Sequence, residues 1–360
     1  MSPRFPPYVG GVETHVSELA KRAKARFQKV SIITTDPKGK LPALEHDETG
    51  LRVYRVKSFA PRENYHFPRP IRFLRCLRDC SPQLLHLHSI HDIPGPLAGF
   101  LDGTVLVLTP HFVGRINSVM GRLLFSAYRP ILRELVGRVA CIICMSQFER
   151  RLMMQEFPGS EGKIQVIPNG VDAFTLSKYS WEEPPVPRIL YAGRLERYKN
   201  VDKLIRAFGH LRKSNPETRL TILGNGPAKQ ELLDLTRELG LSGTVEWFER
   251  VNRSFLYTLF SESTAVVIPS QFENYGIVAA ETISLGVPTV VANSSALSEF
   301  VDAGLARGVD PPVTPESLES AISDVLLNPK GYSFRGKASR TIPSWDEVAA
   351  RTFALYESLN

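Results

Sequence analysis

The sequence has few cysteines and no long apolar run. Its four cysteines form the pairs Cys76/Cys80 and Cys141/Cys144, and neither pair has further Cys or His ligands at the spacing of a zinc site. We therefore predict reduced, mostly buried thiols. No apolar run approaches the roughly 20 residues of a membrane-spanning helix, and the opening residues MSPRFPPYVGG lack the apolar stretch of a secretory signal. These absences predict a cytoplasmic protein, and they leave open a peripheral attachment at the inner face of the membrane.

No finger, recognition-helix or aromatic-rich RNA-binding pattern accompanies the positive charge of the chain, which argues against a nucleic-acid partner. The net charge is +7, but residues 1–175 contain 24 Lys/Arg and 15 Asp/Glu, whereas residues 176–360 contain 20 and 22. The excess of cations therefore belongs to the first half. Such a half fits an anionic membrane or a phosphorylated acceptor better than a nucleic acid.

The order of apolar segments predicts an α/β protein with two domains. From Val30, β-branched runs alternate with amphipathic stretches as VSIIT, LRVYRV, QLLHLH, TVLVLT, CIICM and IQVIP, which indicates a parallel sheet covered by helices. After the joint SWEEPPVP the pattern restarts as RILYAG, RLTILG, TVEWF, AVVIP and PTVVA. We expect an N-terminal domain at 1–175, a C-terminal domain at 176–343, and a helix in 344–360 that packs back towards the N-terminal domain. Doubly wound sheets bind ligands at the carboxyl ends of their strands, which predicts a site in a cleft between the domains.

A glycine turn and two cations follow the first strand of the second domain. In RILYAGRLERYKNVDKLIRAF, Gly193 ends the strand, Arg194 and Lys199 come next, and an amphipathic helix begins near Asn200. An arginine fork, a lysine point charge and a helix N-terminus together suit an anion such as a phosphate. Two surface cations near a turn would look the same in isolation, so this interpretation needs a second motif.

The second motif is a pair of glutamates in VVIPSQFENYGIVAAETISLGVPTVVA. Glu273 lies in the loop after a strand, where it can reach a hydroxylated ligand. Glu281 lies a turn or more into the next helix and can present both oxygens to vicinal hydroxyls such as those of a ribose. Between them the backbone amides at a helix N-terminus suit a diphosphate. These amides belong to Asn274, Tyr275, Gly276, Ile277 and Val278.

With these two motifs the chain resembles the retaining glycosyltransferases of family 4, also called glycosyl transferases group 1. The resemblance spans nearly the whole chain and is densest over residues 188–301. It implies the GT-B fold, in which two doubly wound Rossmann-like domains face a central cleft. It also implies that Arg194 and Lys199 hold the donor diphosphate, that Glu281 binds the ribose, and that Glu273 contacts the transferred sugar.

Three further segments carry the same resemblance. LTILGNGPAKQEL is similar to the family's glycine turn beside the nucleotide, here with Gly224 and Gly226. VEWFERVNRSFLYTLF is similar to the segment whose loop touches the base, here near Arg250 and Val251. IPNGVD resembles the signature that closes the family's first domain.

The first half carries a thinner version of the resemblance. PPYVGGVETHVSELA places Gly10 and Gly11 before a helix, where the family uses glycines for close backbone approach to the donor phosphate and the acceptor. In LTPHF, His111 follows an apolar strand, and the family has a histidine there against the donor sugar. A lone histidine at a strand end is more often structural, and the resemblance reverses that preference. In LLHLHSIHD, alternate strand positions and a turn explain three further histidines better than a metal site does, namely His86, His88 and His91.

Two features depart from the family pattern. After the last strand of the site, ANSSALSEFV matches only at Glu299, so the contacts of that turn are not carried over. The family's glycine loop follows a central apolar strand, whereas only MSPRFPPYV precedes it here. A central strand pairs with both neighbours and is buried on both faces. We therefore predict that the natural protein begins several residues upstream, with an apolar β-branched run.

The reaction that the resemblance implies is transfer of a hexose from a nucleotide-diphosphate sugar to an acceptor hydroxyl, with retention of the anomeric configuration. We expect no metal and no other cofactor, because Arg194 and Lys199 can replace a metal ion at the diphosphate. Uridine and guanosine diphosphate donors stay open, as do lipid-linked and phosphorylated acceptors. A sugar-nucleotide-binding protein without transferase activity is one alternative. A sugar-nucleotide 2-epimerase is another, although the motif order argues against it.

The segment PRPIRFLRCLRDC predicts a basic amphipathic helix. Four arginines recur every three residues, with four apolar side chains between them, namely Arg69, Arg72, Arg75 and Arg78 with Ile71, Phe73, Leu74 and Leu77. Such a helix suits an anionic membrane. The alternative is an ordinary domain helix whose apolar residues pack inward. The positive charge of the first half favours a membrane-associated acceptor.

Overall fold

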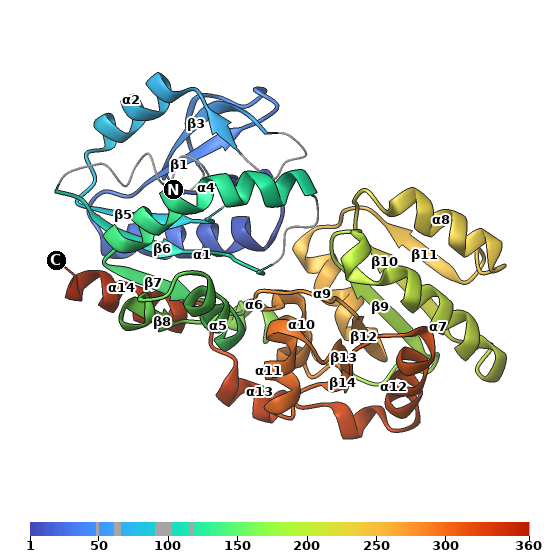
Figure 1. Cartoon of the computed structure of the whole chain (residues 1–360). Helices are drawn as coiled ribbons and strands as arrows, with labels where there is room; N and C mark the ends of the chain where they lie inside the picture. Colours follow the sequence, from blue (N-terminus) through green and yellow to red (C-terminus); the bar gives the residue numbers. More distant parts are fainter. Residues whose placement is uncertain (48–49, 61–65, 91–102, 115–118, 360) are drawn as a thin grey trace. The chain divides into compact units, whose positions relative to one another are not determined.

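The computed structural model divides the chain into two compact α/β units (Figure 1), and it describes residues 1–47, 50–60, 66–90, 103–114 and 119–359. Unit 1 comprises Met1–Asn169 and Trp345–Asn360, and unit 2 comprises Gly170–Ser344. The first boundary falls within the segment IPNGVD, slightly before the expected end of the N-terminal domain. At Trp345 the chain returns to unit 1.

Unit 2 is built on one sheet of six parallel strands in the order β11-β10-β9-β12-β13-β14. The strands are β9 (Arg188–Ala192), β10 (Arg219–Leu223), β11 (Val245–Phe248), β12 (Ala265–Ile268), β13 (Thr289–Ala292) and β14 (Arg307–Val309). The first five confirm the predicted strands, whereas β14 carries too little apolar sequence to be recognised. The order reverses between β9 and β12, which is where doubly wound sheets bind their ligands.

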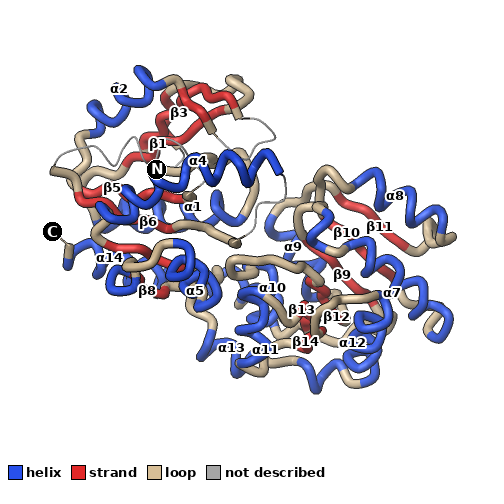
Figure 2. Tube along the Cα trace, viewed as in Figure 1, coloured by secondary structure: helices blue, strands red, loops and turns tan. Residues whose placement is uncertain are grey.

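The helices of unit 2 form two packed groups beside this sheet (Figure 2). Helix α7 contacts α8 and α12, whereas α10 contacts α9 and α13. The helices are α6 (Ala173–Leu176), α7 (Val201–Ser214), α8 (Lys229–Glu238), α9 (Arg253–Ser261), α10 (Ile277–Leu285), α11 (Ser298–Asp302), α12 (Pro315–Leu327) and α13 (Arg335–Thr341).

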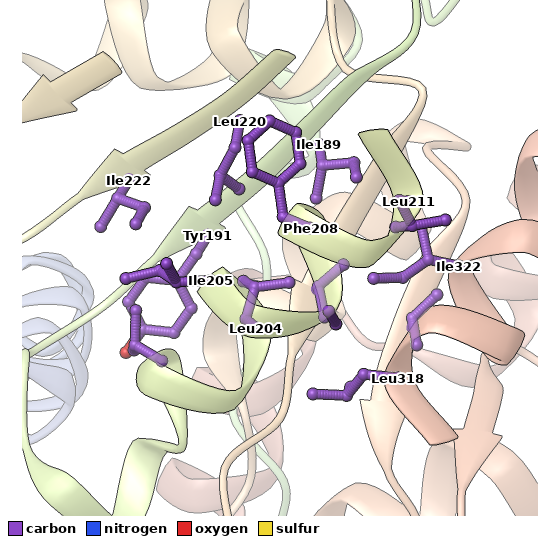
Figure 3. Packing of buried hydrophobic residues seen from close by; sticks show 14 of the residues in the cluster. Ile189, Tyr191, Leu204, Ile205, Phe208, Leu211, Leu220, Ile222, Leu318 and Ile322 are labelled. Carbon is purple, nitrogen blue, oxygen red and sulfur yellow. The ribbon is translucent and has the colours of Figure 1, made fainter. Parts of the chain in front are cut away.

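The largest core of unit 2 joins α7 and α12 to β9 and β10 (Figure 3). The apolar face of α7 repeats at helical spacing, and each of its side chains is at most 1% exposed, as seen for Leu204, Ile205, Phe208 and Leu211. Alternate residues of the two strands complete the cluster, namely Ile189, Tyr191, Leu220 and Ile222. This packing holds the N-terminus of α7 at the carboxyl end of β9, directly after Lys199.

The described residues of unit 1 form two sheets rather than the one parallel sheet predicted for this half. One sheet is parallel, in the order β5-β6-β7-β8, and the other has the order β1-β3-β2 with β4 also paired to β3. Strands β2 and β4 pair antiparallel with β3, and both are short and lack the long apolar runs that strand patterns require. The strands are β1 (Ser31–Asp36), β2 (Leu44–His46), β3 (Arg52–Phe59), β4 (Phe67–Pro68), β5 (Leu84–His88), β6 (Val105–Thr109), β7 (Cys141–Cys144) and β8 (Ile164–Val166).

Met1 and Ser2 lie between the two sheets and bond to both. The Ser2 N–H donates to the Ile33 carbonyl of β1 at 3.0 Å, and the Met1 carbonyl accepts from the His88 N–H of β5 at 2.9 Å. The amino group of Met1 also donates to the His86 carbonyl, at 2.6 Å. These two buried residues occupy the central position expected for the strand before the glycine loop.

The closing helix α14 (Trp345–Ser358) packs within unit 1 against α1 (Gly11–Arg26). Trp345 is 1% exposed and joins a core cluster with Leu19 of α1 and Val107 of β6. At the surface, Arg22 pairs with Asp346 at 2.5 Å. The other helices of unit 1 are α2 (Pro70–Cys80), α4 (Val119–Arg138) and α5 (Gln147–Glu156).

Helix α2 divides its apolar residues between two faces. Phe73 and Leu77 are each 1% exposed and pack into the core, so the expectation that they supply surface is wrong. Ile71 and Leu74 remain 75% and 45% exposed. The four arginines of the segment are exposed as well. The helix therefore has a core face and a separate apolar and basic face.

The thiols are free, and all but the half-buried Cys76 are buried. Burial raises the pKa of Cys141 to about 11. These thiols are accordingly protonated at neutral pH, as expected for structural cysteines. Within the described ranges, no helix combines the length and the apolar character needed to span a bilayer.

Candidate functional site

The turns after β9 and β10 lie in close backbone contact at the carboxyl edge of the unit 2 sheet. The Gly193 N–H donates to the Leu223 carbonyl at 3.0 Å, and the Gly224 N–H donates to the Phe248 carbonyl at 2.8 Å. A Cβ atom at Gly224 would collide with the Gly193 carbonyl oxygen, and one at Gly226 would collide with the backbone of Leu195. Glycine at these two positions therefore allows the two turns to pack closely against each other.

Lys199 and Glu273 form an ion pair across the point where the strand order reverses. The Lys199 Nζ lies 2.5 Å from the Glu273 Oε1, and the two side chains are 12% and 21% exposed. Lys199 ends the turn after β9, and Glu273 follows β12. Burial lowers the pKa of the Lys199 ammonium, but the charge and hydrogen bond of Glu273, together with Tyr198 and Glu196, outweigh burial, so its pKa is raised. Lys199 is thus a fixed cation at the expected anion site.

Arg194 lies in the same turn and is more accessible. Its side chain is 45% exposed, and its Nε lies 2.9 Å from the Glu196 Oε1. The Tyr191 hydroxyl donates to the Arg194 carbonyl at 3.0 Å, which fixes the backbone and leaves the guanidinium to an exposed ion pair. Exposed pairs of this kind contribute little to stability. The arginine fork can therefore be redirected to a ligand at low cost.

The turn that departs from the family pattern nevertheless supports Glu273. The Glu273 N–H donates to the Ser295 Oγ at 3.0 Å, and the Glu273 carbonyl accepts from the Ala296 N–H at 3.3 Å. Ser295 has a left-handed backbone, with φ 55°. Sequence reasoning missed Ser295, because the segment ANSSALSEFV shows no recognisable motif at that position. Glu299 lies in α11. Burial of Tyr275 raises the pKa of its hydroxyl, and the nearby charge of Glu299 raises that pKa further.

A left-handed glycine begins helix α10 between the two glutamates. Gly276 has φ 96° and is the N-cap residue, and a Cβ atom there would lie 2.7 Å from a methyl group of Leu297. The preceding Tyr275 is 9% exposed and packs edge-on against Phe300. The Asn274 Oδ1 is buried without a hydrogen-bond partner among the described residues. The predicted amides of residues 274–278 thus surround the start of α10.

Glu281 is buried in α10 and is held by two side chains that sequence reasoning missed. It is 2% exposed, and its Oε1 accepts from the Arg253 Nη2 at 2.6 Å and from the Tyr257 hydroxyl at 3.3 Å. Arg253 and Tyr257 lie four residues apart on α9, the helix that follows the loop with Arg250 and Val251. That i, i+4 spacing is the only sequence signal for the pair. The expectation that both oxygens face a ligand changes, since Oε1 already serves two donors.

In unit 1, the glycine pair precedes α1 as expected. Gly10 is the N-cap residue with extended backbone, and a Cβ atom there would collide with the Glu13 carboxylate. Glu13 is 3% exposed and pairs with the Arg4 Nε at 2.9 Å. Gly11 is the first residue of the helix. The absence of a side chain at Gly10 therefore allows the buried ion pair to lie against the loop.

His111 belongs to a cluster of four histidines, three of which are buried and one of which, His86, is half-buried. Its backbone is left-handed, with φ 49°, and its Nε2 lies 3.3 Å from the His88 Nδ1. The His15 ring, from α1, packs edge-on at centroid distances of 5.4 Å from His111 and 5.3 Å from His88. The His86 ring lies 4.0 Å from that of His88. His91, also singled out from the sequence, lies outside the described residues.

These imidazoles are neutral at pH 7. Burial lowers the pKa of His15 to about 4, and burial first, then neighbouring positive charge, lowers the pKa values of His86, His88 and His111. The His15 Nδ1 lies 2.6 Å from the Asn169 Oδ1, which can only accept, so Nδ1 carries the proton. His15 and Asn169 had no signal in the sequence analysis. They lie 154 positions apart.

Two family models match the chain. The model described as Glycosyltransferase Family 4 matches residues 9–173, and the model described as Glycosyl transferases group 1 matches residues 178–341. The chain is 26% identical to a glycogen synthase of Mycobacterium tuberculosis, covering 98% of this chain and 92% of that protein. It is 28% identical to a D-inositol 3-phosphate glycosyltransferase of Paenarthrobacter aurescens, covering 96% and 92%.

Solved structures share the fold of the whole chain. A sucrose-phosphate synthase from Thermosynechococcus elongatus superposes with a TM-score of 0.81 at 19% identity, covering 98% of this chain and 94% of that one. Anabaena HepE in complex with UDP and glucose superposes with a TM-score of 0.75 at 16% identity, covering 99% and 98%. These neighbours show the GT-B fold.

The histidine cluster generates a prediction for pH. Unfolded histidines protonate near 6.5, whereas folded His15 protonates only near 4, so the unfolded chain binds more protons between these values. The free energy of unfolding should therefore fall as pH drops through this window, on the order of 3 kcal/mol for His15 alone. Glu149 acts in the opposite sense, because burial raises its pKa from 4.5 to about 7. Because four histidines lower the free energy of unfolding as pH falls and one glutamate raises it, the net effect is a loss of stability.

Urea unfolding across this pH range measures the effect. His15→Gln should flatten the dependence of stability on pH. His210→Gln in unit 2 is the control, since that imidazole is 39% exposed and pairs with Glu319 at the surface. A wild-type stability that stayed constant down to about pH 4 would contradict the prediction.

Proposed function

The chain belongs to the group 1, family 4 glycosyltransferases, and we propose that it transfers a hexose from a nucleotide-diphosphate sugar to an acceptor hydroxyl, with retention of configuration and without a metal ion. The observation that carries this proposal is the cation arrangement at the edge of the unit 2 sheet. Lys199 and Arg194 follow β9, and the amides that begin α10 follow β12. A diphosphate at this edge would meet two cations and a helix N-terminus.

Comparison with relatives supports a nucleotide-sugar donor. Anabaena HepE is described in complex with UDP-glucose, and an Escherichia coli trehalose-6-phosphate protein is described with UDP-2-fluoro glucose. Uridine and guanosine donors share the diphosphate and the ribose. Buried Glu281, anchored by Arg253 and Tyr257, would accept the ribose hydroxyls, and the loop with Arg250 and Val251 would meet the base.

Charge development explains how these groups promote transfer. As the bond between the anomeric carbon and the phosphate oxygen breaks, its electron pair moves to the diphosphate. At about 4 Å and an effective dielectric constant of about 20, one cation contributes roughly 4 kcal/mol before desolvation. Lys199 and Arg194 together would therefore stabilise the leaving group as a metal ion does elsewhere.

Retention requires the acceptor to arrive on the face that the leaving group vacates. Glu273 is the carboxylate that the family resemblance assigns to the transferred sugar, but its ion pair with Lys199 suits it to hold sugar hydroxyls rather than to attack carbon. The acceptor oxygen would bond to the anomeric carbon of an oxocarbenium-like sugar, and the departing phosphate oxygen would take the acceptor proton. Neutral His111 would position and polarise the sugar, as the family resemblance implies.

Removing a diphosphate cation should slow transfer without unfolding the protein. We expect Lys199→Ala and Arg194→Ala each to lower kcat by about 10²–10³, the scale for loss of one preorganised charge-stabilising donor. Arg197→Ala is the matched control, because Arg197 lies in the same turn, is 86% exposed and pairs with Glu231. Transfer of labelled sugar measures the rates. Wild-type kcat in either variant would remove that residue from the site.

Metal independence has a separate test. Transfer should continue at an unchanged rate after dialysis against EDTA, because the proposed leaving-group charges come from side chains and amides. Loss of activity that magnesium or manganese restored would contradict the cation mechanism. Donor binding with neither hydrolysis nor transfer to any acceptor would instead favour a protein that only binds the nucleotide sugar.

The exposed face of α2 supports a membrane-associated, lipid-linked acceptor. Ile71 and Leu74 are exposed apolar side chains on a helix that also carries exposed arginines. Phe59 and Phe67, from the neighbouring strands β3 and β4, are 72% and 40% exposed, and their rings lie 6.3 Å apart. A basic helix with exposed apolar side chains is suited to the interface of an anionic bilayer.

Vesicle sedimentation tests this surface. Wild type should bind anionic vesicles at low salt and bind neutral vesicles weakly, because each cation near an anionic surface contributes about 1 kcal/mol. Changing the four arginines of α2 and its cap to glutamine should lower binding by a factor on the order of 10²–10³. The charge-matched control changes four exposed cations of unit 2 to glutamine, namely Arg188, Arg206, Lys213 and Arg237. Vesicle binding that changed neither with lipid charge nor with the α2 substitutions would contradict membrane attachment.

A further inference from the structure

A fully buried carboxylate lies beneath the loop that carries His111. Glu149 is 0% exposed and lies in the first turn of α5. Its Oε1 accepts the backbone N–H of Phe112 at 2.6 Å, and its Oε2 accepts the backbone N–H of Met145 at 2.7 Å. Phe112 follows the end of β6, and Met145 follows the end of β7. One side chain thus ties together the carboxyl ends of two adjacent parallel strands.

The first of these hydrogen bonds acts directly on His111. The Phe112 N–H belongs to the peptide group that His111 begins, so the bond fixes the orientation of that peptide. His111 has φ 49°, a conformation that non-glycine residues adopt rarely and that persists only where the surroundings impose it. On the other side, the Ile90 N–H donates to the Pro110 carbonyl at 3.0 Å. The strained residue is therefore held from both ends.

Helix capping does not explain the carboxylate. The N-cap Ser146 already accepts the Glu149 N–H at 3.1 Å, and no cation pairs with Glu149 in the part of the chain that the structure describes. Burying a carboxylate without a cation is costly, and burial raises the pKa of Glu149 to about 7. The two backbone donors and the N-terminus of α5 offset part of that cost. An apolar residue would fill the same space equally well. The feature that only a carboxylate supplies here is its two acceptor oxygens, which bind the two backbone N–H groups.

We propose that Glu149 is a positioning residue for His111, holding the peptide after it so that the imidazole keeps its place against His88 and His15. This inference rests on the proposed function in one respect, which is that His111 acts on the donor sugar. Displacing a positioned group by about 1 Å can slow a reaction by about 10². Loss of Glu149 should therefore appear in the rate of the chemical step and leave nucleotide binding by unit 2 intact.

Glu149→Gln is the primary variant. The amide retains one acceptor oxygen, but its NH₂ group faces a backbone N–H where the second oxygen was, so one of the two bonds is lost. We expect kcat to fall by about 10- to 100-fold, while the dissociation constant for UDP or GDP changes less than twofold. The amide of Phe112 should exchange with deuterium faster than in wild type.

Ser146→Ala is the matched control for stability. It removes the cap of the same helix end, which should cost about 1 kcal/mol, and it leaves both carboxylate bonds in place. We expect it to lower the melting temperature while kcat stays within twofold of wild type. If Ser146→Ala and Glu149→Gln lowered kcat equally, Glu149 would only stabilise α5 and the inference would be wrong.

A double-mutant cycle with His111→Ala decides whether Glu149 acts through His111. If it does, Glu149→Gln should add little further loss of kcat once the imidazole is absent. Losses that multiplied independently would overturn the inference while leaving the transferase proposal intact. A wild-type protein that transferred no sugar would instead contradict the proposed function, and exchange at the Phe112 amide would then decide alone whether Glu149 holds this loop.

Discussion

Parallel strands that are buried on both faces leave only their ends for polar chemistry, and this constraint organises unit 2. Strands β12 and β13 are buried at every residue, so no functional side chain can lie along them. The turns after β9, β10 and β12 carry the glycines, the cations and Glu273 instead, and Glu281 follows in α10. Close backbone contact between the turns at Gly193 and Gly224 brings these groups to one edge. The site is thus a consequence of how the sheet is buried.

The charged groups at this edge are paired with one another before any donor binds. Lys199 pairs with Glu273 at 2.5 Å, and Arg253 pairs with Glu281 at 2.6 Å. Both pairs join segments that are distant in the sequence. A donor diphosphate would compete with Glu273 for Lys199 and release that carboxylate toward sugar hydroxyls. In the proposed reaction, this one short ion pair would link diphosphate binding to sugar recognition.

Unit 1 uses neutral groups where unit 2 uses charged ones. Its histidine cluster is uncharged, so in the proposed reaction His111 would offer hydrogen bonds without repelling an electron-poor sugar. The strained backbone at His111 requires support, and the carboxylate of Glu149 provides it from a neighbouring strand end. Such support holds the strained backbone of His111 and distributes its cost over surrounding hydrogen bonds.

Local pattern was enough to predict the alternating strands and helices and the two-unit division, and it supplies the motifs around Arg194, Lys199, Glu273 and Glu281, whose roles stay predictions. Each of these depends on residues that are neighbours in the sequence, such as a β-branched run, a glycine turn or an acidic spacing. Tertiary structure alone decided the split sheet of unit 1, the inward burial of Phe73 and Leu77, and the partners Arg253, Ser295, His15 and Glu149. These features depend on which distant segments meet across a sheet edge, and a hydrogen bond between them leaves no periodic trace in the sequence.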